Sequence, residues 1–532
     1  MSSLTAAQAS SIVALATTLG LFSLPDAMAA QPATAVSPAS CAGLRELATP
    51  TYRVDASDWV AATETAPAHC LFRATIDPRA SGIEDLSYGT GIELRLPAAW
   101  SGRLLFQGGG GLNGVMNPAF GNVNGFASAL ARGYAVVSTD GGHRGRSAID
   151  VRFGVDQQAR LDFAYQAVER STREAKGLVT RVYGRKPDHT YFMGCSTGGR
   201  EALLAAQRLP REFDGVVAGN ASYNLTRIAL NQAFSLQAVT RIAPRDANGK
   251  PDLSRAFSDA QLKGVADAVL KRCDALDGLA DGIIHDARAC RFDPAEQVCG
   301  KRGAPGPGIC LSPAQANTLR TVFGGAKNTR GEMLYGDFPF DTGIASSAWR
   351  GMHLGAPGGA PANATLGRDT LRLFAMTPAA PDFDINHFDF DRDIERTRET
   401  AAINDAVATM LDSFAGRGAK LIVYQGLSDQ AISPGSITQW YEQVTPRKSE
   451  GPQDWARLFP VPGMLHCSGG QATDQFDMLS AIEAWVEKGV APDRVLATGK
   501  SFPGRSRPLC PYPKVARYEG GNPEDERSFA CR

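Results

Sequence analysis

The chain has 532 residues, with 55 Lys and Arg against 55 Asp and Glu, so its formal net charge is zero. Without a basic excess to neutralise phosphates, a nucleic-acid partner is not expected. The composition is typical of a globular protein, and the 56 Gly and 32 Pro predict many turns and loops rather than long coiled helices.

The first 30 residues are typical of a signal peptide. The apolar stretch 11–24 is too short to span a membrane, and Ala27 and Ala29 give the small-residue pattern that signal peptidase accepts. A buried N-terminal helix is the alternative, because no Lys or Arg precedes the apolar stretch. We expect a secreted or periplasmic protein. No second apolar run has the length of a membrane span, so no membrane partner is expected.

Strand and helix patterns alternate through the first part of the chain. Short apolar runs predict strands, and apolar residues at helical spacing predict a helix. The predicted strands cover 103–106, 134–140, 190–193 and 213–219, and the predicted helix covers 200–209. This alternation predicts an α/β fold in which helices cover both faces of a parallel sheet.

The alternation stops after about residue 220 and returns with apolar runs at 419–424 and 458–461. The stretch between is long and irregular. We therefore expect one α/β domain, formed by 31–220 and 411–532, with an insertion over 221–410. Two consecutive domains are the alternative, but candidate catalytic residues on both sides of the insertion favour a single domain.

Ser196 lies in the hexapeptide GCSTGG, which fits the pattern G-x-S-x-G. The motif follows a predicted strand and precedes a predicted helix, which is the context of a nucleophile elbow. Glycines relieve crowding at such a turn, and the helix N-terminus favours negative charge near the serine oxygen. The pattern alone also occurs by chance, but in this context it predicts a nucleophilic serine.

A nucleophilic serine needs a base and an acid, and in this fold the acid precedes the histidine along the chain. His466 is the only one of seven histidines that follows the returning strand at 419–424, and Asp429 comes just past that strand. Asp429 would fix the tautomer of the imidazole and stabilise its protonated form. Singly, Asp429 could be a turn residue and His466 a surface histidine, but their order predicts a triad with Ser196.

Both Ser196 and His466 have a cysteine neighbour, Cys195 and Cys467 respectively. All ten cysteines follow the predicted signal peptide, and an even number on an exported chain favours disulfides over buried thiols. If His466 reaches Ser196, the two cysteines come within the Cα separation of a disulfide, about 4.4–6.8 Å. We expect this bridge to hold nucleophile and base together. A Cys195 nucleophile is the weaker alternative, because it lies one residue off the apex of the turn.

Two loops predict binding groups. Gly108 to Gly111 follow a predicted strand, so backbone amides there, with that of Thr197, could hold an oxyanion. A phosphate-binding loop is the alternative, but the Gly-Lys-Ser/Thr ending is missing. The loop 273–283 carries three closely spaced aspartates, which suit Ca²⁺, although a solvated acidic turn fits that spacing equally well.

From about residue 41 to residue 531 the chain resembles the tannase/feruloyl esterase family. The resemblance is carried by the stretches GGGGLNG, STDGGH, YFMGCSTGGRE, CDALDGLADGI, QGLSD, VPGMLHCSGG, FDMLSAIEAWVEKGVAPD and RPLCPYPKVARY. Within the family, the chain is most similar to the subgroup that hydrolyses mono(2-hydroxyethyl) terephthalate. The resemblance implies an α/β-hydrolase fold with a large inserted lid domain.

The resemblance also implies the roles of individual residues. It implies a triad of Ser196, Asp429 and His466, and an oxyanion hole formed by the amides of Gly111 and Thr197. It implies a structural Ca²⁺ in the lid domain, held by the side chains of Asp274, Asp277 and Asp281 and the carbonyls of Leu279 and Ile283. The implied disulfides are Cys41–Cys70, Cys195–Cys467, Cys273–Cys290, Cys299–Cys310 and Cys510–Cys531.

Around the substrate, the chain departs from that subgroup. Met352 stands where the subgroup has a tryptophan, Ile432 replaces an aromatic residue, and Arg368 or Arg372 could serve as its lid arginine. We therefore expect a monomeric serine esterase for esters of small aromatic acids, with phenolic esters and terephthalate monoesters as candidate substrates. A non-catalytic binding protein on the same fold and a secreted serine peptidase are the alternatives.

Overall fold

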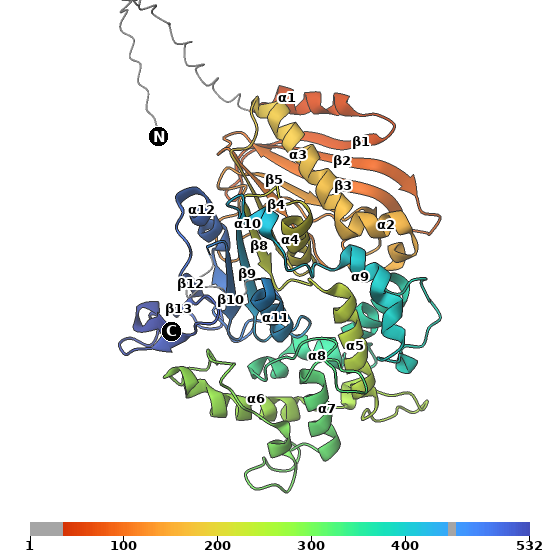
Figure 1. Ribbon diagram of the computed structural model, residues 1–532, viewed down its shortest axis with the longest axis vertical. Helices are drawn as coiled ribbons and strands as arrows, with labels where there is room; N and C mark the ends of the chain where they lie inside the picture. Colours follow the sequence, from red (N-terminus) through yellow and green to blue (C-terminus); the bar gives the residue numbers. More distant parts are fainter. Residues whose placement is uncertain (1–35, 445–453) are drawn as a thin grey trace, which may run out of the picture.

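A ten-stranded sheet forms the centre of the molecule (Figure 1). The computed structural model describes residues 36–444 and 454–532, so the predicted signal peptide lies outside the described residues. The strand order is β1-β2-β3-β5-β4-β7-β8-β9-β10, and β6 pairs with β3. The strands are β1 (Tyr52–Val60), β2 (His69–Ala80), β3 (Ser87–Pro97), β4 (Arg103–Gln107), β5 (Ala135–Thr139), β6 (His143–Arg144), β7 (His189–Cys195), β8 (Gly215–Gly219), β9 (Lys420–Gly426) and β10 (Ala456–Val461).

The sheet is parallel over the part that the sequence predicted. Each neighbouring pair from β5 to β10 is parallel, and all six predicted strands are present. The strands β1, β2 and β3 were not predicted. They run antiparallel and join the sheet where β3 pairs with β5, so the sheet is mixed. The first of them, β1, is mostly exposed or half-buried, so it lacks the apolar run of a buried strand.

Alternate side chains of the central strands are buried on opposite faces of the sheet. Leu104 and Phe106 of β4 belong to one hydrophobic core, and Leu105 belongs to the other. Residues of α3, α4 and α11 fill the first core, and residues of α12 fill the second. The bounds of the helices around the sheet are α1 (Pro38–Ala42), α2 (Gln157–Leu161), α3 (Ala167–Tyr183), α4 (Thr197–Arg208), α11 (Pro434–Val444) and α12 (Met478–Lys488).

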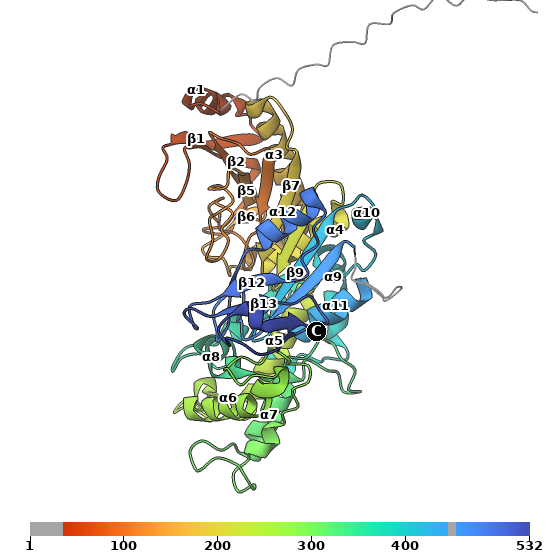
Figure 2. The same cartoon turned by 90° about the vertical axis from the view of Figure 1, so that its left-hand side faces the viewer.

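Between β8 and β9, residues 220–419 form helices and loops and contribute no strand. The helices are α5 (Leu225–Thr240), α6 (Asp259–Cys273), α7 (Pro313–Phe323), α8 (Ser347–His353), α9 (Arg398–Asn404) and α10 (Asp412–Ala415). Both α6 and α7 begin with a capping box, at Ser258 and Ser312, which explains where they start. They pack around a hydrophobic core of their own, below the sheet in Figures 1 and 2.

The C-terminal part of the chain adds two small sheets beside the central one. The strands are β11 (Gln475–Phe476), β12 (Val495–Thr498), β13 (Ser506–Leu509), β14 (Ala516–Tyr518) and β15 (Phe529–Cys531). In Figure 2 this part lies between the central sheet and the helices α6 and α7. None of the described helices has the length and apolar character needed to cross a membrane.

Candidate active site

Ser196 lies at the turn between β7 and α4, as the sequence predicted. Its φ and ψ of 63° and −123° belong to a strained region that non-glycine residues rarely adopt. Glycine is needed on both sides of the serine. A Cβ at Gly194 would lie 2.5 Å from the backbone of Gly198, and a Cβ at Gly198 would lie 2.7 Å from the carbonyl oxygen of Gly109. The strand, the helix and the glycine loop therefore pack together at the serine.

His466 lies between Ser196 and Asp429. Its Nε2 is 2.9 Å from Ser196 Oγ, and its Nδ1 is 2.8 Å from Asp429 Oδ2. The Asp429 side chain is fully buried, whereas 24% of the His466 side chain is exposed. Because the carboxylate accepts a hydrogen bond from Nδ1–H, the lone pair of Nε2 faces the serine hydroxyl. The structure thus brings the three predicted residues into contact in the predicted order.

The charges of Asp429 and His466 stabilise each other. Burial raises the pKa of Asp429, but the charge and hydrogen bond of His466, with a hydrogen bond from Asn220, hold that pKa below its usual value. Burial lowers the pKa of His466, but the negative charge of Asp429 outweighs this effect and raises that pKa above its usual value. The imidazole is therefore a better proton acceptor than a histidine in water.

A disulfide joins Cys195 to Cys467, the neighbours of Ser196 and His466, as predicted. The two Cα atoms are 6.0 Å apart, and the bond links segments separated by 272 residues. Because the Cys195 sulfur is bonded, it has no thiol, and the alternative of a Cys195 nucleophile is wrong. The other four disulfides are also those that the resemblance implied: Cys41–Cys70, Cys273–Cys290, Cys299–Cys310 and Cys510–Cys531.

The two predicted oxyanion residues, Gly111 and Thr197, are neighbours in space. The Thr197 hydroxyl donates a hydrogen bond to the Gly111 carbonyl oxygen. Gly111 has a φ of 58°, and a Cβ there would lie 2.1 Å from the carbonyl oxygen of Ala148, so the position requires glycine. Within residues 36–444 and 454–532, neither the Gly111 N–H nor the Thr197 N–H has a hydrogen-bond acceptor. Two amide donors are therefore available beside Ser196.

Glu201 supports the glycine loop from behind and was missed by the sequence reasoning. Its carboxylate accepts hydrogen bonds from the Gly109 N–H at 2.8 Å and from Asn113 Nδ2 at 2.7 Å. The side chain is buried, and burial raises its pKa. Glu201 lies on α4, so the helix that begins at the serine also positions the loop that carries Gly111. The signal in the sequence was a charged residue among the apolar residues of a predicted helix, which indicates a buried carboxylate.

Asn220 was also missed, although it contacts the predicted catalytic acid. Its Nδ2 donates a hydrogen bond to Asp429 Oδ2 at 2.7 Å, and Gln425 Nε2 lies 3.3 Å from the same oxygen. The amides of Ala431 and Ile432 donate to Asp429 Oδ1 at 2.8 and 3.0 Å. Asn220 directly follows β8, the neighbour of β9, so the shared end of two adjacent strands was the signal for this contact.

The predicted substrate-pocket residues fall into two groups. Met352 and Ile432 belong to one buried apolar cluster. Arg368 and Arg372 both form ion pairs with Asp369, at 2.8 and 3.1 Å. The two arginines line a hollow of about 460 Å³ that does not include Ser196. The structure therefore brings Met352 and Ile432 together, whereas the two arginines pair with the carboxylate of Asp369.

The acidic loop predicted to bind calcium has its carboxylates already engaged, except one atom. Asp274 accepts hydrogen bonds from backbone amides, and Asp281 forms an ion pair with Arg507. Among the described residues, Asp277 Oδ2 is buried without a hydrogen-bond partner, and burial together with the charge of Asp281 raises the pKa of Asp277 to about 6. Among the residues described, no three His, Cys, Asp or Glu side chains converge as they do around a metal ion.

A mostly parallel sheet with a strained serine at the turn after a central strand is the arrangement of an α/β-hydrolase. The family model described as "Tannase and feruloyl esterase" matches residues 83–532 of the chain. The chain therefore belongs to the tannase and feruloyl esterase family, as the motifs predicted.

Three relatives illustrate this membership. The chain is 38% identical to mono(2-hydroxyethyl) terephthalate hydrolase of Piscinibacter sakaiensis, over 90% of this chain and 87% of that protein. It is 29% identical to probable feruloyl esterase B-2 of Neosartorya fischeri, over 83% of each. The crystal structure of feruloyl esterase B from Aspergillus oryzae has 26% identity and a TM-score of 0.78, and it covers 93% of this chain and 100% of that one.

Proposed function

We propose that the protein is a serine carboxylic ester hydrolase that acts on esters of small aromatic acids. The observation that carries this proposal is the chain of hydrogen bonds from Ser196 through His466 to Asp429, at 2.9 and 2.8 Å. The names of the relatives specify feruloyl esters and a terephthalate monoester, and in both the acid is aromatic. We therefore assign an aromatic acid to the acid half of the substrate, and feruloyl esters and terephthalate monoesters are both candidates.

The contacts at the site support the following sequence of steps. Ser196 Oγ attacks the ester carbonyl while His466 Nε2 accepts the hydroxyl proton. The N–H groups of Gly111 and Thr197 donate to the oxyanion that forms, because neither has another acceptor in the part of the chain that the structure describes. His466 then protonates the leaving alcohol, and water, activated by the same imidazole, releases the aromatic acid from Ser196.

We assign residues 221–410 as a lid that also supports the catalytic acid. Two contacts to the residues on either side of Asp429 support this role. The Ser428 hydroxyl donates a hydrogen bond to the Asp341 carboxylate, and His353 Nε2 lies 3.3 Å from the Gln430 carbonyl oxygen. Met352, on the same helix as His353, shares a buried cluster with Ile432, so the lid would form one wall of the acyl pocket.

A structural Ca²⁺ at the loop of Asp274, Asp277 and Asp281 is part of the proposal. The donor set of carboxylates and carbonyls suits this ion, and Asp277 Oδ2 is a buried acceptor without a partner among the residues that the structure describes. The carbonyls of Leu279 and Ile283 would complete the set. Because Asp281 forms an ion pair with Arg507, Ca²⁺ would compete with Arg507 for the Asp281 carboxylate. If calcium binds, excess chelator should lower the melting temperature by several degrees, and Asp277→Asn should abolish that response.

Secretion is proposed from the sequence of the first 30 residues and from the five disulfides, which persist in oxidising compartments. Removal of the predicted signal peptide can be tested by mass spectrometry of the protein recovered from outside the cytoplasm. A mature chain that begins near residue 30 is expected, and a retained N-terminus would contradict it.

The test of the function is a Ser196→Ala variant assayed with feruloyl, galloyl, chlorogenic and terephthalate monoesters. We expect turnover to fall by about 10⁴-fold or more with the melting temperature retained. Full activity in the variant would refute the proposal. A serine-directed phosphonate should label Ser196, which a non-catalytic binding protein would not allow, and peptide substrates separate an esterase from a peptidase. Comparison of kcat/KM across the panel would then assign the acid.

A further inference from the structure

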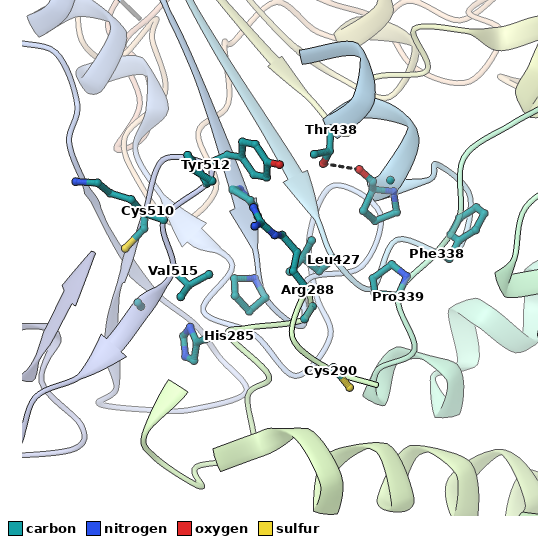
Figure 3. Close-up of a pocket in the computed structure, with 18 of the residues that line it drawn as sticks. His285, Arg288, Cys290, Phe338, Pro339, Leu427, Thr438, Cys510, Tyr512 and Val515 are labelled. Atoms are coloured by element: carbon teal, nitrogen blue, oxygen red, sulfur yellow. Dashed lines mark hydrogen bonds between the residues drawn. The ribbon is translucent and has the colours of Figure 1, made fainter. Parts of the chain in front are cut away.

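A cavity of about 560 Å³, separate from the hollow beside Arg368 and Arg372, lies where the lid, α11 and the C-terminal residues 508–516 meet (Figure 3). Ser196, His466 and Asp429 are not among the residues that line it. Its volume is in the range of small-molecule sites, roughly 300–1,000 Å³. It is therefore a separate candidate site for a ligand.

The walls of this cavity are held in place by covalent constraints. Two of the lining residues, Cys290 and Cys510, belong to disulfides with Cys273 and Cys531. Six prolines line the cavity as well: Pro339, Pro434, Pro460, Pro462, Pro508 and Pro513. Proline has a fixed φ, and a disulfide restricts the two chain segments that it joins. The walls of the cavity therefore have little conformational entropy left to lose when a ligand binds.

The charge of the lining favours an anion. Arg288, Arg291 and Lys514 line the cavity, and in the part of the chain that the structure describes none of them forms an ion pair. Two acidic residues also line the cavity: Asp337, and Glu442, which accepts a hydrogen bond from the Tyr512 hydroxyl. Three cationic groups therefore stand against two carboxylates, and the lining has a net positive charge.

The same lining favours an aromatic ring. Phe292, Phe338, Phe340 and Tyr512 contribute rings to the walls. The Arg288 guanidinium carbon lies 5.0 Å from the centre of the Tyr512 ring, and Figure 3 shows this side chain extending toward the tyrosine. We propose that this cavity binds a small aromatic carboxylate, with its ring among these side chains and its carboxylate on Arg288. The ligand class includes the acid that the proposed reaction would release, but the binding does not depend on that reaction.

One lid segment connects this cavity to the loop that carries Asp429. Phe338, Pro339 and Phe340 line the cavity. At one end of the segment, the Asp337 carbonyl oxygen accepts hydrogen bonds from Ser433 Oγ at 2.5 Å and from the Gly435 N–H at 3.3 Å. At its other end, Asp341 accepts the hydrogen bond from Ser428. A ligand that packs on this segment would therefore order residues 428–435.

The test uses the full-length Ser196→Ala protein with 4-iodobenzoate as the probe, so that no turnover is involved. Crystals soaked with the probe should show an anomalous iodine peak between Arg288 and Phe338. Calorimetry should show that Arg288→Ala weakens binding at least tenfold, while Arg302→Ala, at an exposed arginine outside the cavity, leaves it unchanged. The uncharged analogue 4-iodobenzyl alcohol should bind at least tenfold more weakly. Thr438→Trp, which fills the cavity from α11, should also abolish the peak.

Hydrogen exchange provides the second readout. The probe should slow amide exchange within residues 428–435 in the Ser196→Ala protein and have no such effect when Arg288 is also replaced by Ala. An iodine peak confined to the region of Ser196, or equal affinity in the Arg288→Ala and Arg302→Ala proteins, would overturn the proposal. Because none of these measurements involves hydrolysis, their failure would leave the proposed esterase activity untouched.

Discussion

The two ends of the Ser196–His466–Asp429 chain are held by different kinds of bond. At the serine end, the Cys195–Cys467 disulfide ties the backbone beside Ser196 to the backbone beside His466. At the acid end, there is no covalent tie. The Asp429 carboxylate is held by four hydrogen-bond donors besides His466.

This difference separates two requirements of the proposed mechanism. The distance between Ser196 and His466 must survive movements of the long segment between β8 and β9, and a covalent bond secures it. The acid must instead stay ionised in a buried position, and this requires hydrogen-bond donors rather than a fixed distance. Asp341 and His353 of the proposed lid contact Ser428 and Gln430, the neighbours of Asp429, so the acid end should be the more sensitive to changes in that segment.

The largest effect is expected when the acid end is changed directly. Asp429→Asn keeps the shape but removes the charge, so kcat should fall by about 10⁴-fold. Burial would then act on His466 without the opposing carboxylate, so the pKa of the imidazole should fall and the residual activity should persist to lower pH. Steady-state kinetics from pH 4 to pH 9 would check this. Asp405→Asn, at another buried aspartate, is the control and should keep the wild-type pH midpoint.

Removal of the disulfide at the serine end should have a smaller effect. The double variant Cys195→Ser/Cys467→Ser should lose about 10²-fold in kcat, because a displacement of about 1 Å between base and nucleophile is enough for such a loss. The matched control Cys510→Ser/Cys531→Ser removes a disulfide elsewhere and should retain kcat even if its melting temperature falls. Equal losses of kcat in the two double variants would show that the tie at Ser196 has no special role.

A single donor to the acid should matter less again. Asn220→Ala removes the 2.7 Å hydrogen bond to Asp429, and kcat should fall about tenfold with KM unchanged. Asn220→Asp should be worse, because a second carboxylate would raise the pKa of Asp429. The buried Asn231, which accepts from the Ala326 N–H, is the control for general destabilisation. If Asn231→Ala lowered kcat as much, Asn220 would have only a structural role.

The smallest expected effect concerns the unmodified protein: the pH midpoint of its kcat/KM profile should differ from the pKa of an ordinary histidine. His466 must be neutral to accept the serine proton, so kcat/KM should rise with pH through the pKa of this group. Because Asp429 raises that pKa, the midpoint should lie above the ordinary histidine value of about 6.5. A midpoint below that value would mean that burial outweighs the carboxylate.

The sequence was sufficient for the parts of the site that follow local rules. The turn at Ser196 has a motif, the strand before Asp429 has an apolar run, and the order of the residues constrains which histidine can act. From these it followed that Cys195 and Cys467 would be close enough to bond. The six buried strands were predicted for the same reason, because continuous apolar runs are a strong signal.

The missed residues depend on contacts between distant segments. Asn220 and Glu201 contact residues far away in sequence, Asp429 and Gly109. Their local signals, a polar residue at a strand end and a charged residue within an apolar helix, do not identify these partners. The antiparallel strands β1 to β3 were missed because polar residues interrupt their apolar ones. The positions of Arg368 and Arg372 could not be predicted because Asp369, between them in sequence, attracts both.

The disulfide beside Ser196 also closes a ring of backbone that contains the whole segment between β8 and β9 and part of the central sheet. Every residue from 196 to 466, including the exposed stretch that contains Lys301 and Arg302, lies inside that ring. A protease that nicks the ring once therefore produces two fragments that remain one molecule until a reductant is present. Outside the cell, where proteases are abundant and reductants scarce, scission of a surface loop would leave Ser196 and His466 in one covalently linked molecule.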